Sequence, residues 1–263
     1  MKYLILQDVV HAVRLWPIWV RLGLQDMRLR FRRSALGIGW IFLNLVIMLL
    51  AIGFIYSKLL GQDLKEFLPF LTVGLVMWGY ITASVVEGGN AFIAAEGYIK
   101  QIGLPIYIYI FRLFVSVSLT MLISFLAFIV VGLAYEVQFS LGVLWAGGGL
   151  VLIGLVSILL ITIFAHLNAR FRDISHIASV VLQVTFYVTP IIWPPEMLRQ
   201  RGVSWVIDWN PFYHLLEVVR RPLLYSVPAA IHNYLCVGLF IFLLTAVTGI
   251  VTWRFHRRLV YFL

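Results

Sequence analysis

Side chains that could perform covalent or metal chemistry are few and scattered along this chain. A phosphate-binding GxxxxGK[ST] loop needs a lysine directly after a glycine. The four lysines instead follow Met, Ser, Leu and Ile (Lys2, Lys58, Lys65 and Lys100). There is no HExxH motif, no His or Cys pair at metal-ligand spacing, and no DxD cluster that could hold a metal-bound diphosphate. The sequence therefore predicts that this chain itself binds no metal or cofactor and hydrolyses no ATP.

Aromatic residues are the best candidates for contacting a ligand, since they make up 15% of the chain. Several fall near the ends of apolar runs, where tryptophan and tyrosine commonly form an interfacial belt. Sugar rings present C–H faces that stack on aromatic rings, so the same residues could line a conduit along which a glycan slides. Belt and conduit explain any single one of them equally well. The candidates are Trp40, Trp78, Tyr80, Phe186, Tyr187 and Trp193.

Three small hydroxyl residues, Ser116, Thr120 and Ser124, follow one another at intervals of four. On a helix this spacing places them on one face. Such a stripe usually marks close packing between membrane helices, although it can also line a polar pore. Packing is the favoured interpretation here.

The elements that must hold these residues are long apolar helices. Of the 263 residues 62% are hydrophobic, above the roughly 50% of soluble domains. Six stretches lack any Asp, Glu, Lys or Arg, and each has the ~20 residues needed to cross a bilayer. A soluble α/β protein is disfavoured, because its buried helices would be shorter and carry polar faces. We therefore predict an all-α integral membrane protein with six spans, at about 37–57, 67–87, 107–134, 142–166, 176–193 and 230–253.

Basic residues predict how these spans are oriented. With the N-terminus in the cytoplasm, the cytoplasmic segments carry the whole net charge of +9 and the outer segments are neutral. Lys and Arg are retained on the cytoplasmic side and six spans return the chain there, so both termini are expected to be cytoplasmic. The excess of Lys and Arg over Asp and Glu thus indicates membrane topology and not nucleic-acid binding. No ionisable residue falls in the middle of a span, so transport would need an energy source on a partner.

Residues 1–33 are predicted to form a cytoplasmic region ahead of the membrane domain, 34–263. Pro17 suits the first turn of a helix, and apolar and polar side chains follow it with helical spacing. The apolar face comprises Val20, Leu24, Met27 and Phe31. The basic residues of the helix and its end are Arg21, Arg28, Arg32 and Arg33. We expect an amphipathic helix lying on membrane lipids at the cytoplasmic surface, in preference to a simple basic flank.

A short cytoplasmic helix is predicted between the second and third spans. Residues 90–101 have a helical pattern, which Gly103 and Pro105 end. A short helix between two spans could receive a push from a soluble motor, although a solvated loop helix would have the same pattern.

The outer segment before the last span predicts short helices in or dipping into the outer leaflet. Three prolines break the fifth span between 190 and 195, and Asn210 and Pro211 begin a new amphipathic piece. Its apolar face comprises Phe212, Leu215, Leu216 and Val219. Its polar face comprises His214, Glu217 and Arg221.

Several blocks of the sequence resemble motifs of type-2 ABC exporter permeases. Residues 32–40, RRSALGIGW, are similar to the family's R-x-S-x-L-G-x-x-W entry into the first span. Residues 170–173, RFRD, resemble its R-[FY]-R-D loop. Residues 189–193, TPIIW, and 209–212, WNPF, resemble its T/S-P-I-[IL]-[YW] and N-P segments. The resemblance is to permeases that export O-antigen, capsule or teichoic acid polysaccharides.

The resemblance implies a homodimer of six-span subunits in the bacterial inner membrane, with two separate cytoplasmic ATPase subunits that bind ATP and Mg²⁺. It implies a lipid-linked polysaccharide as the substrate. Segment 194–221 corresponds to the family's short outer helices. The residues that correspond to the family's coupling helix are Glu96, Gly97, Tyr98, Lys100 and Gln101. Those that correspond to its cytoplasmic loop motif are Arg170, Arg172 and Asp173.

Two alternatives remain open at this point. The first is a permease of the same fold that exports a drug or a lipo-oligosaccharide. The second, from a different class, is a membrane-embedded enzyme of envelope synthesis. Such an enzyme would need a catalytic histidine or paired carboxylates at one membrane face, which the sequence does not offer.

Overall fold

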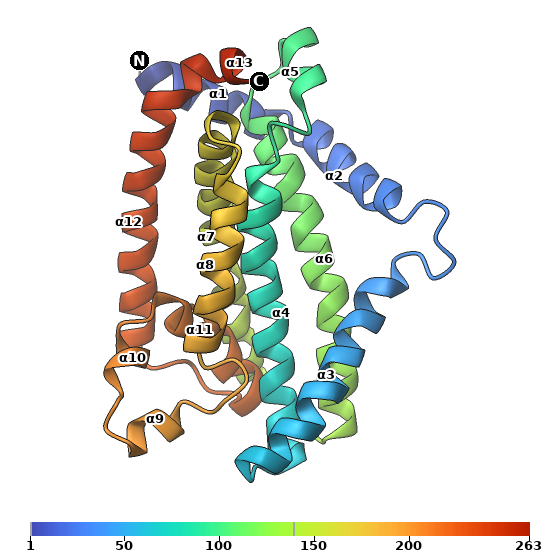
Figure 1. Cartoon of the computed structure of the whole chain (residues 1–263), viewed down its shortest axis with the longest axis vertical. Coiled ribbons are helices and arrows are strands. Elements are labelled where there is room, and N and C mark those ends of the chain that lie inside the picture. Colours follow the sequence, from blue (N-terminus) through green and yellow to red (C-terminus); the bar gives the residue numbers. More distant parts are fainter. Residues whose placement is uncertain (1, 139) are drawn as a thin grey trace.

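The computed structural model describes residues 2–138 and 140–263, and every regular element in this part of the chain is a helix. The helices form an elongated bundle, with α1, α5 and α13 at one end and α9 and α10 toward the other (Figure 1). The α-helices are α1 (Lys2–Arg14), α2 (Trp16–Arg30), α3 (Gly39–Leu60), α4 (Leu64–Gly89), α5 (Glu96–Gln101), α6 (Tyr107–Ala134), α7 (Leu144–Arg170), α8 (Ile174–Val188), α9 (Glu196–Gln200), α10 (Trp205–Asp208), α11 (Pro211–Tyr225), α12 (Ile231–Phe255) and α13 (Leu259–Phe262). The 3-10 helices are η1 (Leu141–Val143) and η2 (His256–Arg258).

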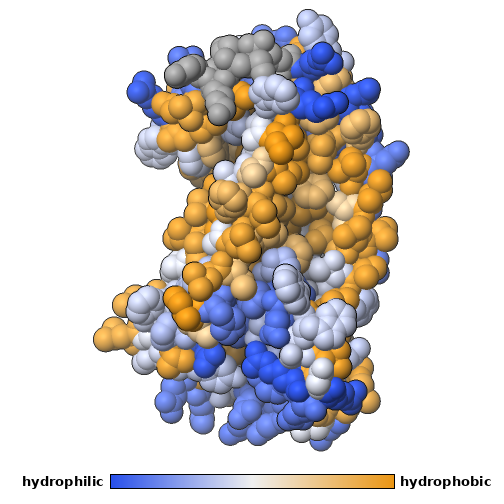
Figure 2. All heavy atoms as spheres, turned by 90° about the vertical axis from the view of Figure 1, so that its left-hand side faces the viewer, coloured by the Kyte–Doolittle hydropathy of each residue, from blue (hydrophilic) through white to orange (hydrophobic). Residues whose placement is uncertain are grey.

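Five helices are long and apolar enough to cross a membrane, and they fall on five of the six predicted spans. These are α3, α4, α6, α12 and the continuous helix Leu141–Arg170, with mean hydropathies from 1.6 to 2.7. Seen from the α12 side, apolar side chains form a band across the middle of the molecule, between hydrophilic ends (Figure 2). The chain is therefore a multi-pass, all-helical membrane protein.

The fifth predicted span, 176–193, is shorter in the structure. It is occupied by α8, which has 15 residues and ends at Val188. Pro190 disfavours helical backbone at the residue before it, and Thr189 is accordingly extended, with φ −86° and ψ 136°. At 1.5 Å per residue α8 is roughly 22 Å long, less than the ~30 Å thickness of the hydrocarbon core. Six complete spans therefore stay a prediction.

Helix α4 forms the centre of the bundle, between α6 on one side and α7 and α8 on the other (Figure 1). Its span is 72% buried, whereas that of α3 is only 11% buried. Small residues let α4 approach α7 closely: a Cβ on Gly88 would lie 3.1 Å from the Cα atom of Ile161. One buried hydroxyl pair, Ser84 and Ser157, joins the two helices at 2.7 Å. This pattern is typical of close packing between membrane helices.

The N-terminal region contains two helices, whereas the sequence predicted one. Helix α2 has Pro17 in its first turn as expected, but α1 precedes it. The predicted apolar face of α2 is partly wrong: Leu24 is 39% exposed, and the buried residues are Gly23 and Met27. Gly23 determines which face of α2 is buried. Its Cα lies so close to the carbonyl of Arg112 that a Cβ would clash with it. The glycine lets α2 pack on the backbone of α6.

The helices of the segment predicted to be outer, α9, α10 and α11, lie at the end of the bundle opposite α1 (Figure 1). Asn210 caps α11 as expected, since its side chain accepts hydrogen bonds from the backbone N–H groups of Phe212 and Tyr213 at 3.0 and 3.3 Å. His214 of the predicted polar face is buried, and its side chain is hydrogen-bonded to that of Asn233 at 2.7 Å. Helix α11 packs against α7, α12 and α4 together, and so it is covered on several sides.

Candidate functional site

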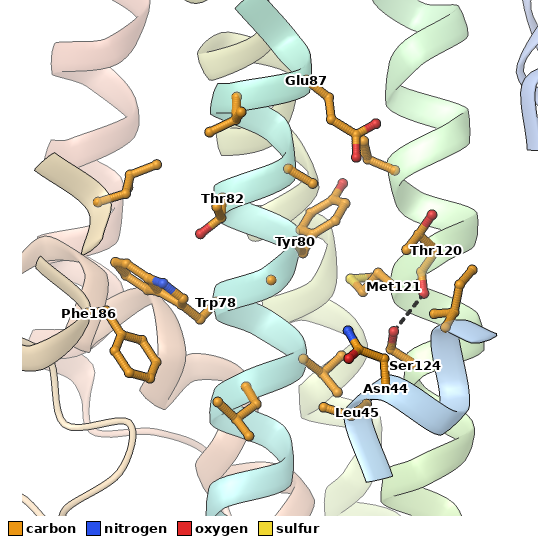
Figure 3. Close-up of a pocket in the computed structure, with 18 of the residues that line it drawn as sticks. Asn44, Leu45, Trp78, Tyr80, Thr82, Glu87, Thr120, Met121, Ser124 and Phe186 are labelled. Atoms are coloured by element: carbon orange, nitrogen blue, oxygen red, sulfur yellow. Dashed lines mark hydrogen bonds between the residues drawn. The ribbon is translucent and has the colours of Figure 1, made fainter. Parts of the chain in front are cut away.

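A groove with a volume of about 750 Å³ runs along α4. Helices α3 and α6 form one wall and α8 forms the other (Figure 3). The groove exists because α3 diverges from the bundle and α8 buries only one narrow face, made of Ser175, Ala178 and Leu182. Its lining is mainly apolar, with polar groups at intervals. A mainly apolar lining with a small number of polar groups is typical of ligand-binding sites.

The floor of the groove is the exposed face of α4. Gly79 lies there with no side chain, and a Cβ at this position would meet no atom within 4 Å. The groove therefore has free space directly beside Gly79. On either side, Trp78 points toward α8 and Tyr80 toward α6 (Figure 3). The hydroxyl of Tyr80 is 3.0 Å from that of Ser118, which fixes the ring against α6.

Three of the six aromatic candidates line the groove, namely Trp78, Tyr80 and Phe186. The rings of Trp78 and Phe186 are 6.0 Å apart, and Trp78 also meets the edge of Phe212 at 5.6 Å. Trp78, Phe186 and Phe212 thus form a cluster of rings, here called the aromatic corner, between α4, α8 and α11.

The other three aromatic candidates do not line this groove. Trp40, near the start of α3, and Tyr187, near the end of α8, are 48% and 60% exposed. Trp193 is partly buried, and its indole N–H donates to the carbonyl oxygen of Tyr187 at 3.1 Å. Trp40 and Tyr187, at the ends of apolar helices, and Trp193, in the turn after α8, have positions that suit an interfacial belt.

Several polar residues of the groove were missed by the sequence interpretation. They are Asn44 on α3, Thr82 on α4, and Ser179 and Gln183 on α8. A helical spacing of four was the available signal, because Ser179 and Gln183 share a face with Phe186. Together they supply hydrogen-bonding groups that a wholly apolar lipid-facing surface would lack.

The hydroxyl stripe on α6 is divided between packing and lining. Ser116 is 1% exposed, whereas Thr120 and Ser124 line the groove. The hydroxyl of Thr120 donates to the carbonyl of Ser116 at 3.1 Å, and that of Ser124 donates to the carbonyl of Thr120 at 2.9 Å (Figure 3). These hydroxyls are satisfied within their own helix, so they make the groove wall smooth and weakly polar.

At the end of the bundle that holds the termini, α5 projects as a short exposed helix (Figure 1). The Lys100 ammonium donates to the Glu96 carboxylate at 2.7 Å, and this hydrogen bond lowers the pKa of Glu96. Tyr98 is 51% exposed on the same helix, Gln101 is also exposed, and Gly97 faces open space. The helix thus presents charged and aromatic groups on an exposed surface that another protein could contact.

The loop after α7 is held by a buried amide. Asn168 donates to the carbonyl of Gly89 at 3.0 Å and accepts from the backbone N–H of Ser175 at 3.0 Å. The Arg170 guanidinium lies over the ring of Phe262, 5.2 Å from its centroid. The other two motif residues, Arg172 and Asp173, are exposed. The loop therefore connects the ends of α4, α7 and α8 and contacts the C-terminal helix α13.

The four arginines predicted for the surface helix are all exposed, namely Arg21, Arg28, Arg32 and Arg33. The structure adds ion pairs that the sequence interpretation missed. Arg112 of α6 donates to both carboxylate oxygens of Asp26 at 2.6 Å, and Arg30 pairs with Glu87 at the end of α4. The less exposed pair, Asp26–Arg112, links α2 to α6.

Comparison with known proteins places this architecture in a family. Residues 19–224 match the model of the family described as ABC-2 type transporter. This chain belongs to the ABC-2 type transporter family. The matched region runs from α2 to α11 and contains the whole groove lining. The resemblance to type-2 ABC permeases is therefore confirmed.

Curated relatives of this ABC-2 type chain carry a more specific name. This chain is 27% identical over 194 residues to the O-antigen export system permease protein RfbA of Myxococcus xanthus. The aligned region covers 73% of this chain and 74% of the relative. Two permease proteins of the same name from Klebsiella pneumoniae are 26% and 28% identical over 204 and 210 residues, with 77% of this chain and 78% of each relative covered.

Proposed function

We propose that this chain is the permease subunit of an ATP-driven exporter that carries a lipid-linked polysaccharide across the bacterial inner membrane. The observation that supports this most strongly is the groove along α4, within a chain of the ABC-2 type transporter family whose relatives are named O-antigen export permeases. A groove open at the side suits a substrate with a lipid in the bilayer and a sugar chain in the protein. Its aromatic corner at Trp78 and Phe186 suits stacking on sugar rings.

A homodimer would convert this groove into a conduit. Two-fold symmetric dimers are the commonest assemblies, and each copy contributes the same surface. Helices α3 and α8 flank the groove and leave most of their surface exposed. Two copies that meet along these helices would place their grooves face to face. The two chains together would then enclose a sugar polymer.

Both termini would lie in the cytoplasm, and α8 would act as a short sixth span. The arrangement in Figure 1, with α1 and α13 at the same end of the bundle, is compatible with an even number of crossings. The positive charge of the segments at this end favours the cytoplasmic side. Residues 1–33 would lie along that surface, and 34–263 would form the membrane domain.

Energy would come from two copies of a cytoplasmic ATP-binding subunit, which hold ATP and Mg²⁺. The surface offered to them comprises α5, with Glu96, Gly97, Tyr98, Lys100 and Gln101, and the loop with Arg170, Arg172 and Asp173. Closure of the ATPase subunits on ATP would push α5. This push would reach the groove because α5 follows directly after α4.

Replacing Glu96 or Lys100 with leucine should uncouple the ATPase from export. Either change breaks the Glu96–Lys100 ion pair and puts an apolar side chain on the contact surface. We expect the ATPase activity of the assembled exporter to lose most of its stimulation by the permease, in membranes that contain both proteins. The matched control is Lys58→Leu, which changes an exposed lysine in the last turn of α3, away from α5. Normal stimulation in both α5 variants would exclude this helix as the coupling element.

Complementation tests the function as a whole. The chain and its ATPase partner are expressed in a bacterium whose own O-antigen permease has been deleted, and surface polysaccharide is measured by antibody binding to intact cells. We expect surface polysaccharide to return, and only when the ATPase can hydrolyse ATP. Accumulation of polysaccharide inside the cells, together with resistance to a drug or export of a short lipo-oligosaccharide, would instead support the other substrates of the same fold.

A further inference from the structure

A second cavity lies on the side of the bundle that faces the termini. It has a volume of about 370 Å³ and is lined by residues of α2, the end of α4, the turn before α5 and the first half of α6. Glu87 lines both this cavity and the groove along α4. The two spaces therefore adjoin at one carboxylate, and a group held in the smaller cavity is next to the entrance of the groove.

The charges of this cavity are arranged as two unequal ion pairs. Arg112 and Asp26 form a bidentate pair whose side chains are only 20% and 26% exposed. Arg30 and Glu87 are more accessible, at 39% and 35%, and Arg30 is the last residue of α2. An accessible ion pair contributes little to stability and exchanges partners readily. Arg30 is thus the guanidinium that an incoming anion can take over.

Two hydroxyl groups in the wall of the cavity have no partner. The side-chain oxygens of Tyr109 and Ser116 are buried, and neither makes a hydrogen bond within the described residues. Both residues line the cavity, and they are 2% and 1% exposed. Buried polar groups are nearly always paired in proteins, and these two hydroxyls, in a cavity that Arg30 also lines, are free to bond a group that enters it.

We propose that this cavity binds the phosphate-bearing headgroup of a lipid in the cytoplasmic leaflet before the lipid enters the groove. Arg30 leaves Glu87 and binds two phosphate oxygens with its planar guanidinium, which fits this geometry better than an ammonium group. The hydroxyls of Tyr109 and Ser116 then donate to the remaining oxygens. Glu87, released from its partner, then carries an unpaired negative charge between the cavity and the groove. This charge repels the phosphate until the headgroup passes into the groove.

The phosphate can come from two sources. One is the diphosphate of a lipid-linked substrate, which rests on the proposed function. The other is an ordinary anionic phospholipid that stays bound at the site. Both have the same chemistry, so the probes of the experiment must separate them.

Binding is measured on the purified full chain in nanodiscs of the neutral lipid phosphatidylcholine. The probes are a short-chain prenyl diphosphate, the corresponding uncharged prenol, and a short-chain phosphatidylglycerol. For the wild type we expect saturable binding of the prenyl diphosphate and none of the prenol. Competition by an equal concentration of phosphatidylglycerol would identify the site as one for ordinary phospholipid, and absence of competition would identify a substrate site.

Variants locate the binding to this cavity. Arg30→Gln should weaken prenyl diphosphate binding roughly tenfold or more, the usual effect of losing a charge-assisted hydrogen-bonding partner. Glu87→Gln should strengthen it, because Arg30 is then no longer neutralised. Arg254→Gln removes an exposed arginine of α12 and should change nothing. Equal binding by the Arg30→Gln and Arg254→Gln variants would overturn the proposal.

Two milder substitutions guard against loss of folding. Tyr109→Phe and Ser116→Ala keep the shape of the wall and remove only the hydroxyls, and each should weaken binding severalfold. If both leave binding unchanged while the thermal melting curves match the wild type, the proposal is wrong. The assay needs no export, so phosphate binding by a chain that fails to restore surface polysaccharide would contradict the proposed function alone.

Discussion

Replacing Gly79 with tryptophan should stop polysaccharide export and leave the protein folded. Gly79 lies on the floor of the groove, where an added Cβ meets no atom within 4 Å, so a large side chain can be accommodated without disturbing α4. The indole would then occupy the free space of the groove beside Gly79, between Trp78 and Tyr80. We expect surface polysaccharide in the complementation assay to fall close to the level of cells without a permease.

The matched control for this experiment is Gly147→Trp on α7. Gly147 also has no atom within 4 Å of an added Cβ, but it does not line the groove. This variant should export normally, and Gly79→Ala should export at an intermediate rate. Full export by Gly79→Trp, at normal protein levels in the membrane, would show that the polymer passes elsewhere.

Replacing Arg220 with alanine should produce the largest loss of stability. The side chain is 1% exposed, and its guanidinium lies 3.9 Å from the ring centroid of Phe70. It donates to the carbonyl of Pro190 at 2.9 Å and to Glu217 at 3.4 Å. Removing one partner of a buried ion pair leaves the other charge uncompensated, which costs about 3–5 kcal/mol. We expect a clear fall in the thermal melting temperature of the purified protein.

The neighbouring residue provides the control for Arg220. Arg221 is exposed on the same helix, so Arg221→Ala should change stability by no more than about 0.5 kcal/mol. The double variant Arg220→Met with Glu217→Gln removes both charges and keeps much of the volume, and it should recover part of the stability. Equal melting temperatures for the Arg220→Ala and Arg221→Ala variants would mean that the buried pair does not hold α11 in place.

The long helices could be predicted from the sequence because bilayer crossing depends on a property of each segment alone. An uncharged apolar run of sufficient length predicts a span wherever it occurs, and α3, α4, α6, α7 and α12 follow this rule. The outer helix α11 shows where such reasoning ends. Its amphipathic pattern indicated one buried face, but His214 and Arg220 are buried as well. Their partners, Asn233 and the carbonyl of Pro190, lie on other segments.

The groove was only partly predictable for the same reason. Aromatic residues near helix ends were visible in the sequence, yet whether Trp78 lines the groove and Trp40 does not depends on how α3 leans away from α4. The pairs Asp26–Arg112 and Arg30–Glu87 join positions 86 and 57 residues apart. No local pattern connects such positions, and only the packing of both α2 and α4 on α6 brings them together.

The short length of α8 has a consequence for the lipids around it. Its C-terminal end is followed by the turn at Thr189 and Pro190, where the Thr189 hydroxyl accepts from Asn210 and the Pro190 carbonyl accepts from Arg220. A helix shorter than the hydrocarbon thickness draws the surrounding bilayer inward, because exposed backbone ends cannot remain among acyl chains. The leaflet beside α8 should therefore be dimpled. A hydrophilic sugar chain that crosses the membrane next to α8 would pass a thinner hydrocarbon layer than elsewhere around the protein.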